Sequence, residues 1–157
     1  MSATKSNQKP DIRAVIDTNI FVRALACLEP ESTFYTSAIR ICWKLVISEH
    51  IAEEYRRVIN EYGYPAVAVI HEINKLHSIN KYRPSKADPN TVSSDLAPRK
   101  DRHIVAPCLE GRANLIVTHD GGIHEKKEKI AAATGAEVLH LEEAQARLHA
   151  THAGGRP

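Results

Sequence analysis

A short apolar segment that ends in three polar residues constrains the fold of this chain most strongly. The Ala14-Val15-Ile16 run is small and β-branched, as in a short buried strand, and Asp17-Thr18-Asn19 follows it at once. Such a strand delivers the Asp17 carboxylate to the carboxyl end of a sheet, where open α/β sheets bind ligands. Capping of the next helix needs only one residue of this kind. We therefore interpret the whole triplet as a candidate site.

The apolar pattern along the rest of the chain alternates between strands and helices. The predicted strands cover residues 14–16, 43–47, 81–83, 115–118 and 137–141. The predicted helices cover residues 20–28, 32–42 (with Ser32 as N-cap), 65–78, 101–111 and 142–149, with one more that begins after Ser48 and another that ends near Thr134. Residues 84–98 are rich in Pro, Ser, Asp and Asn and are predicted to form a loop. This alternation predicts an α/β fold with a parallel sheet and helices on both faces.

Two features interrupt the pattern. Pro107 lies inside the helix that opens at Asp101 and should kink or shorten it, because proline removes a backbone hydrogen bond. The Gly121-Gly122 pair follows Asp120, and we interpret it as a loop turn. A GxGxxG pattern is absent, so no dinucleotide-binding fingerprint is present.

Length and composition indicate one domain of ordinary globular type. The 157 residues show no break in composition, and we expect a folded domain over residues 12–149 between disordered tails at 1–11 and 150–157. The N-terminal segment lacks the apolar core of a signal peptide, and no apolar run approaches the length of about 20 residues that a membrane span requires. We therefore expect a cytoplasmic protein without membrane association. The net charge of +2 neither demands nor excludes a polyanionic partner.

Acidic residues from four distant segments are predicted to share one pocket. Asp17 and Asp120 both follow buried strands, Asp101 opens a helix, and Glu54 lies in the helix after Ser48. Clustered carboxylates repel one another unless a cation neutralises them. Mg²⁺ or Mn²⁺ suits such a pocket because both ions prefer oxygen ligands, and either can activate water for attack on a phosphodiester. The pattern therefore predicts metal-assisted hydrolysis of phosphodiesters.

Two of these positions have rivals in the sequence. Asp95 could take the place of Asp101, whose helix contains Pro107. Glu53 could likewise take the place of Glu54. Composition and periodicity leave both alternatives open.

Histidines flank the acidic residues and offer a further possibility. His119 and His124 lie on either side of Asp120, and His103 follows Asp101, so a histidine could transfer protons or bind a transition metal. There is no CxxC or HExxH motif, so we do not expect a dedicated zinc site.

Taken in order, three motifs resemble the PIN domain. They are Asp17-Thr18-Asn19 after a strand, Ser48-x-x-Ile51-x-x-Glu54 at the start of a helix, and Asp101-x-x-Ile104-x-Ala106 leading into Leu115-Ile116-Val117-Thr118-x-Asp120. The resemblance covers approximately residues 12–148. It is closest to the bacterial and archaeal PIN proteins that are described as toxins of toxin–antitoxin pairs.

This resemblance implies a three-layer α/β/α Rossmann-like fold with a central, mainly parallel sheet, and metal-dependent ribonuclease activity. It implies that Mg²⁺ or Mn²⁺ is ligated by the acidic set Asp17, Glu54, Asp101 and Asp120. It also implies that the site is supported by the polar residues Thr18, Asn19 and Thr118. The partners it implies are an RNA substrate, a second copy in a homodimer and an antitoxin protein.

The basic residues beside Asp101 are candidates for RNA contacts. Arg99, Lys100 and Arg102 could hold RNA phosphates near the metal, and a solvated helix face is the alternative explanation. The alternative function is a PIN-fold RNA-binding or assembly module without efficient cleavage. A phosphotransfer receiver domain is disfavoured, because it needs paired acids after the first strand and Asp17 stands alone there.

Overall fold

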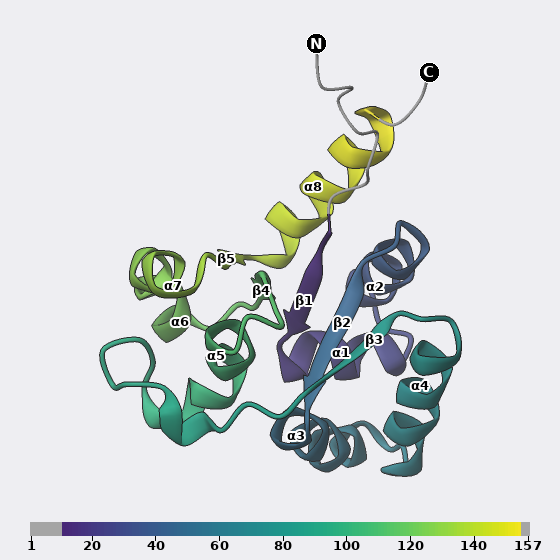
Figure 1. Cartoon of the computed structure of the whole chain (residues 1–157). Coiled ribbons are helices and arrows are strands. Elements are labelled where there is room, and N and C mark those ends of the chain that lie inside the picture. Colours follow the sequence, from purple (N-terminus) through teal and green to yellow (C-terminus); the bar gives the residue numbers. More distant parts are fainter. Residues whose placement is uncertain (1–10, 155–157) are drawn as a thin grey trace.

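A five-stranded parallel sheet forms the centre of the computed structural model, which describes residues 11–154 (Figure 1). Its strands are β1 (Arg13–Ile16), β2 (Lys44–Ser48), β3 (Tyr82–Ser85), β4 (Leu115–Val117) and β5 (Glu137–Leu139). They lie in the order β3-β2-β1-β4-β5, and every neighbouring pair is parallel. The predicted α/β fold with a mainly parallel sheet is confirmed.

Helices cover both faces of this sheet (Figure 1). Within residues 11–154 there are eight α-helices: α1 (Thr18–Leu25), α2 (Glu31–Arg40), α3 (Glu49–Ile59), α4 (Val67–Ser78), α5 (Arg102–Leu109), α6 (Gly121–Glu125), α7 (Lys127–Thr134) and α8 (Leu141–Gly154). Short 3₁₀ turns occupy Asn60–Tyr62, Pro89–Thr91 and Arg99–Asp101. Helix α1 packs against α2 and α3, whereas α5 packs against α7. Within these residues no helix is both long and apolar enough to cross a membrane.

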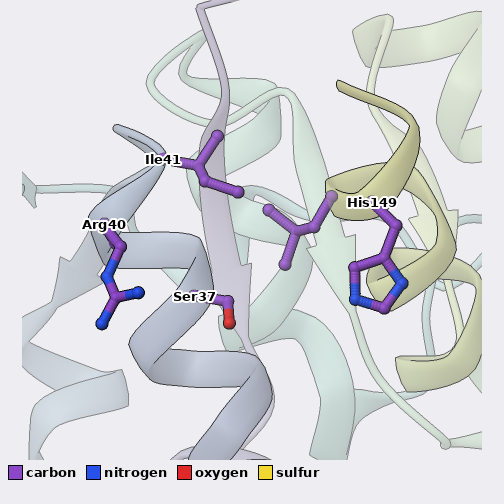
Figure 2. A pocket seen from close by; sticks show the side chains of 5 residues that line it. Ser37, Arg40, Ile41 and His149 are labelled. Atoms are coloured by element: carbon purple, nitrogen blue, oxygen red, sulfur yellow. The ribbon is translucent and has the colours of Figure 1, made fainter. Parts of the chain in front are cut away.

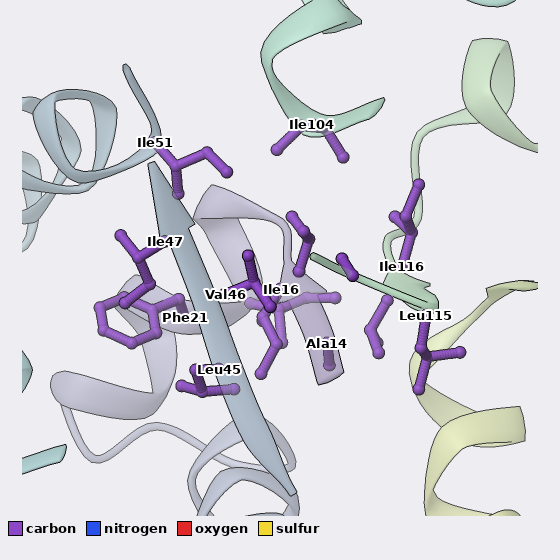
Figure 3. Close-up of a cluster of buried hydrophobic side chains, with 14 of the residues drawn as sticks. Ala14, Ile16, Phe21, Leu45, Val46, Ile47, Ile51, Ile104, Leu115 and Ile116 are labelled. Atoms are coloured by element: carbon purple, nitrogen blue, oxygen red, sulfur yellow. The ribbon is translucent and has the colours of Figure 1, made fainter. Parts of the chain in front are cut away.

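The core forms because the central strands are apolar on both faces. Figure 3 shows Phe21 of α1, Ile51 of α3 and Ile104 of α5 gathered around the side chains of β1, β2 and β4. The Phe21 ring also stacks on Tyr55 of α3, with ring centroids 4.0 Å apart, and the Tyr55 hydroxyl donates to the backbone carbonyl of Ile16. Full burial of each such side chain contributes about 1.5–3 kcal/mol, which anchors α1, α3 and α5 to the sheet.

The strand order reverses where the candidate site was predicted. From β1 the chain proceeds to β2 and β3 on one side, and β4 and β5 lie on the other. Where the strand order reverses, at neighbouring β1 and β4, an open α/β sheet forms a ligand-binding crevice beyond the carboxyl ends. Asp17 directly follows β1, and its backbone N–H donates to the carbonyl of Val117 in β4 at 2.9 Å. Asp120 follows β4 at the same edge of the sheet. The region at this edge that carries Asp17, Glu54, Asp101 and Asp120 is called the crevice below.

The first two helices begin and end differently from the prediction. Helix α1 begins at Thr18, since Asp17 caps it, and it ends before Cys27, whose φ of +59° is incompatible with a helix. Helix α2 begins at Glu31, so Ser32 lies inside it and the prediction of a Ser32 cap is wrong. Glu29 instead accepts the backbone N–H of Thr33 at 2.8 Å, which leaves no need for a serine cap.

Pro107 lies in helix α5, and Gly121-Gly122 lies at the start of helix α6. Helix α5 spans only eight residues, shorter than predicted, and Pro107 lies in its last turn. The interpretation of Gly121-Gly122 as a loop turn is wrong, because α6 begins there. The Asp120 carboxylate accepts the backbone N–H groups of Gly122 and Ile123 at 2.8 and 3.2 Å, and this cap starts the helix.

The remaining differences lie at chain segments far from the crevice. Strand β3 includes Pro84, which was assigned to a loop, and this is possible because β3 is an edge strand. Strand β5 ends at Leu139, and α8 continues to Gly154, so residues 150–154 of the expected tail are helical. Residues 1–10 and 155–157 of the two expected tails lie outside the described residues.

Candidate active site

Asp17 and Glu54 are joined through one threonine. The backbone N–H of Thr18 donates to Oδ1 of Asp17 at 2.8 Å, and the Thr18 hydroxyl donates to Oε1 of Glu54. Thr18 is buried at the first turn of α1, so it fixes the distance between the carboxylates that β1 and α3 supply. Asn19, the third residue of the triplet, is exposed and makes no side-chain hydrogen bond within residues 11–154.

Thr118 links the two aspartates that follow neighbouring strands. It is fully buried after β4, and its hydroxyl donates to Oδ2 of Asp17. The hydroxyl oxygen of Thr118 also accepts the backbone N–H of Asp120 at 3.0 Å. A hydroxyl has one proton to donate and two lone pairs to accept with, so Thr118 satisfies both bonds at once.

Asp101 is the most deeply buried of the four acidic residues, with 7% of its surface exposed. Its Oδ2 is buried and accepts no hydrogen bond from any described residue. Burial and the nearby negative charge of Asp120 raise the pKa of Asp101 to about 6, and Asp17 adds to this effect. A Cβ atom built on Gly122 would lie 3.1 Å from Oδ1 of Asp120 and 3.6 Å from Oδ2 of Asp101, so the two carboxylates meet at this glycine.

The two alternative acidic residues that the sequence offered, Asp95 and Glu53, are both exposed. Asp95 is exposed and pairs with Lys129 at 3.0 Å, and this ammonium group holds the pKa of Asp95 below its usual range. Glu53 is exposed, whereas its neighbour Glu54 is half-buried against Thr18. The structure therefore brings Asp101 and Glu54 to the crevice and leaves both rivals outside it.

His103 contacts the site in a way that the sequence did not reveal. Its Nε2 lies 3.0 Å from Oε2 of Glu54, and this contact lowers the pKa of the Glu54 carboxyl. Burial lowers the pKa of His103, but the negative charges of Glu54, Asp17 and Asp101 outweigh burial and raise it. The only sequence signal was the position of His103 two residues after Asp101; its partner on α3 could not be inferred from spacing.

The chain also matches a known family of protein domains. The family model of the PIN domain matches residues 13–121, from β1 to the first residue of α6. The chain belongs to the PIN-domain family. The matched segment contains all four acidic residues of the crevice, and PIN domains are generally nucleases that use divalent metal ions. No curated protein matches the chain.

The crevice of this PIN domain has the chemistry of a site for a hard divalent cation. Among residues 11–154, no three His, Cys, Asp or Glu side chains are arranged to hold a metal ion as they stand. The donors at the crevice are nevertheless carboxylate oxygens, the ligands that Mg²⁺ and Mn²⁺ prefer. An unpaired buried acceptor such as Oδ2 of Asp101 costs about 1–3 kcal/mol, and a bound cation would remove this cost. The residues therefore fit such an ion.

The predicted RNA-contacting residues of the PIN domain surround Asp101. Arg99 and Lys100 are exposed on the 3₁₀ turn before α5, and the charge of Lys100 acts on Asp101 to lower its pKa, against the larger effect of burial. Arg102 is partly buried, and its Nε has no hydrogen-bond partner among the described residues. Two cations thus face solvent beside the acidic crevice.

A separate cavity lies between α2 and α8 and does not belong to the acidic site (Figure 2). Its volume is about 160 Å³. The residues that line it are Ser37, Arg40, Ile41, Leu148 and His149. None of the four acidic residues contributes to this lining, so we assign it no part in the site.

Replacing Thr118 with valine should release both aspartates, because valine keeps the shape of threonine and removes its hydroxyl. The partly buried N–H of Asp120 loses its acceptor and Oδ2 of Asp17 loses its donor, so we expect the free energy of unfolding to fall by about 1–3 kcal/mol. Amide hydrogen exchange of Asp120 should accelerate in Thr118→Val but stay slow in Thr118→Ser, which keeps the hydroxyl. Equal exchange rates in the two variants would contradict the role of Thr118.

Proposed function

We propose that this PIN domain is a metal-dependent endoribonuclease that hydrolyses RNA phosphodiesters. The observation that carries the proposal is the Asp101 carboxylate, which is buried beside Asp120 with one oxygen unpartnered. The neighbouring carboxylates of Asp101 and Asp120 repel each other, which lowers the stability of the fold. Such pairs of like charges are typical of sites that bind a cation or perform catalysis. The carboxyl end of β1 adds Asp17 to this pair, beside the segment after β4 that carries Asp120.

Each side chain of the crevice has a proposed role. Asp17, Asp101 and Asp120 would hold Mg²⁺ or Mn²⁺, with Glu54 as the fourth acidic member of the site. When bound, such an ion lowers the pKa of a water molecule and stabilises negative charge on the phosphodiester. Thr18 and Thr118 support the site, because they fix the orientations of the Asp17 and Glu54 carboxylates and of the Asp120 backbone.

RNA would reach the crevice along its cationic border. The exposed Arg99 and Lys100 lie next to Asp101, where they can bind the phosphates that flank the scissile bond. Such contacts weaken as salt concentration rises, because binding releases counterions from the nucleic acid. Phosphate contacts carry no sequence information, so target choice would rest on the shape of the surrounding loops.

The proposal extends to a toxin of a toxin–antitoxin pair that acts in the cytoplasm as a homodimer and is held in check by an antitoxin protein. Exposed apolar side chains at α4 support a protein partner. Tyr64, Val67 and Ile70 are 42%, 46% and 44% exposed and lie in or just before this helix. Exposed apolar surface of this kind often marks a site of protein association.

A second candidate function is an RNA-binding or assembly module that keeps the PIN fold without efficient cleavage. The observation that favours it is the state of Glu54, since Thr18 and His103 each contact one of its two oxygens. A carboxylate held in this way is less available to a metal ion.

Cleavage of a labelled mixed-sequence RNA in Mg²⁺, Mn²⁺ or EDTA distinguishes the two functions. We expect cleavage with either ion and none in EDTA. Glu54→Gln should cut about 100-fold more slowly, because even an outer partner of a metal site typically contributes about 10- to 100-fold. Glu53→Gln removes the same charge from the neighbouring exposed position and should cut at the parental rate. Absence of both cleavage and Mn²⁺ binding would contradict the nuclease and favour the assembly module.

A further inference from the structure

Three histidines that have no role in the proposed nuclease lie close together near Asp120. His119 follows β4, His124 lies in α6, and His140 joins β5 to α8. The rings of His124 and His140 are stacked, with centroids 3.6 Å apart and planes 7° from parallel. The rings of His119 and His140 have centroids 5.6 Å apart, and their Nδ1 atoms are separated by 3.3 Å.

This separation of the two Nδ1 atoms matches a pair of ligands on one transition-metal ion. Two nitrogen ligands at about 2.0–2.1 Å from a tetrahedral zinc ion lie about 3.3–3.4 Å from each other. Hydrogen bonds from N–H donors are commonly about 2.7–3.2 Å long. The 3.3 Å between the Nδ1 atoms of His119 and His140 lies within hydrogen-bond range, and it also equals the separation of two nitrogen ligands on one Zn²⁺ ion.

Neighbouring contacts hold the rings of His124 and His140 in position. Nε2 of His124 donates to the backbone carbonyl of Thr118 at 2.7 Å, which anchors the His124 ring. The ring of His140 stacks on this His124 ring. The backbone N–H of His140 donates to Oε1 of Glu143 at 2.9 Å, which fixes the start of α8 and places a carboxylate next to the imidazoles. Histidines that bind metals are generally anchored by such surrounding contacts.

Although the sequence has no CxxC or HExxH motif and predicts no zinc site, we infer from this geometry that His119 and His140 form a Zn²⁺ site, separate from the acidic crevice. Imidazole nitrogens suit Zn²⁺, whereas Mg²⁺ and Mn²⁺ prefer carboxylate oxygens, so the two sites take different ions. His119 is exposed, so the ion can enter from solvent and water can fill its remaining positions. A bound ion would tie the segment after β4 to the segment after β5 beside Asp120. The inference does not depend on nuclease activity.

Titration of the full chain with Zn²⁺ in saturating Mg²⁺ tests the site by calorimetry. We expect one Zn²⁺ per chain, with affinity about 100-fold weaker in His119→Gln and in His140→Gln, because each loses one of two protein ligands. His71→Gln is the matched control, because it removes an exposed histidine on α4. Asp17→Asn should bind Zn²⁺ as the parent does.

Thermal unfolding provides a second measurement. An ion that binds only the folded chain raises Tm, so Zn²⁺ should raise the Tm of the parent and of His71→Gln but not of His140→Gln. His119→Gln changes an exposed side chain, so it keeps the test available if His140→Gln fails to fold. Unchanged Zn²⁺ affinity in both His119→Gln and His140→Gln would overturn the inference. Loss of Zn²⁺ binding in Asp17→Asn alone would also overturn it, since the ion would then lie in the acidic crevice.

Discussion

Asp17→Asn should reduce metal-dependent RNA cleavage by about 100-fold or more, because it removes a ligand charge from the centre of the proposed site. Asp17 contacts both supporting threonines, through Oδ1 to Thr18 and through Oδ2 to Thr118. No other acidic residue within residues 11–154 is bonded to both. Initial cleavage rates in Mn²⁺ and Mn²⁺ affinity, measured on the same preparations, should fall together.

The fold should survive this substitution because each hydrogen bond has a replacement. Asparagine keeps one oxygen to accept the backbone N–H of Thr18, so α1 remains capped. Its amide group can donate to the Thr118 hydroxyl, which has two lone pairs and uses one for the N–H of Asp120. We therefore expect Tm in EDTA to equal that of the parent or to rise slightly, as one negative charge leaves the cluster.

Asp11→Asn is a suitable control for Asp17→Asn, because Asp11 is an exposed carboxylate that pairs only with Arg13 among the described residues. It should leave cleavage and Mn²⁺ affinity unchanged. Cleavage by Asp17→Asn at the parental rate would remove Asp17 from the active site. A large fall in Tm would show instead that Asp17 acts mainly as a helix cap.

The positions of Asp17 and Asp120 could be predicted because backbone topology determines them. Each follows a buried strand, and the carboxyl ends of neighbouring parallel strands share one edge of a sheet. The choice between Asp101 and Asp95 could not be made in this way. Asp95 lies in the irregular segment before α5, and only the folded chain shows it turned toward Lys129.

Contacts between side chains from distant segments could not be predicted from the sequence. Neither the bond from Thr118 to Asp17 nor the pair of His103 with Glu54 follows from a periodic pattern, because each joins two different elements. The start of α6 was missed for a related reason. A glycine pair predicts a turn from local propensity, but the Asp120 cap overrides that propensity.

Asp101→Asn should abolish cleavage and at the same time stabilise the fold at neutral pH, whereas Asp95→Asn should do neither. Asp101 is buried beside Asp120, and the pKa of its carboxyl is about 6, against an ordinary value of 3.8. Asp95 is exposed and bound to Lys129. The two substitutions remove the same charge, so any difference between them comes from the environment of each carboxylate.

The sign of the pH effect follows from the raised pKa of Asp101. Because the folded chain holds this proton more tightly than the unfolded chain, the contribution of Asp101 to stability is fully present below about pH 3.8. It is lost as the pH rises toward 6, and above that value the ionised carboxylate destabilises the fold. Asparagine does not ionise, and its amide can donate to the carboxylate of Asp120.

Urea unfolding in EDTA at about pH 4 and pH 7.5 measures this difference. The free energy of unfolding of Asp101→Asn, relative to the parent, should increase by about 1–2 kcal/mol between the two pH values. The same comparison for Asp95→Asn should change in the opposite direction or remain flat, because Lys129 favours the ionised form of Asp95. A flat result for Asp101→Asn would mean that its carboxyl is solvated in solution, and the site would lose its buried acid.

Addition of Mg²⁺ completes the experiment, because a cation in the crevice should relieve the repulsion that Asp101→Asn removes by mutation. We expect Mg²⁺ to raise the Tm of the parent and of Asp95→Asn at pH 7.5, and to leave Asp101→Asn unchanged. A variant that gains stability while it loses both cleavage and the response to Mg²⁺ would show that the strain at Asp101 is kept for function. Equal responses of all three proteins to Mg²⁺ would place the ion away from Asp101. Asp95 would then again be a candidate for the fourth acidic residue of the site.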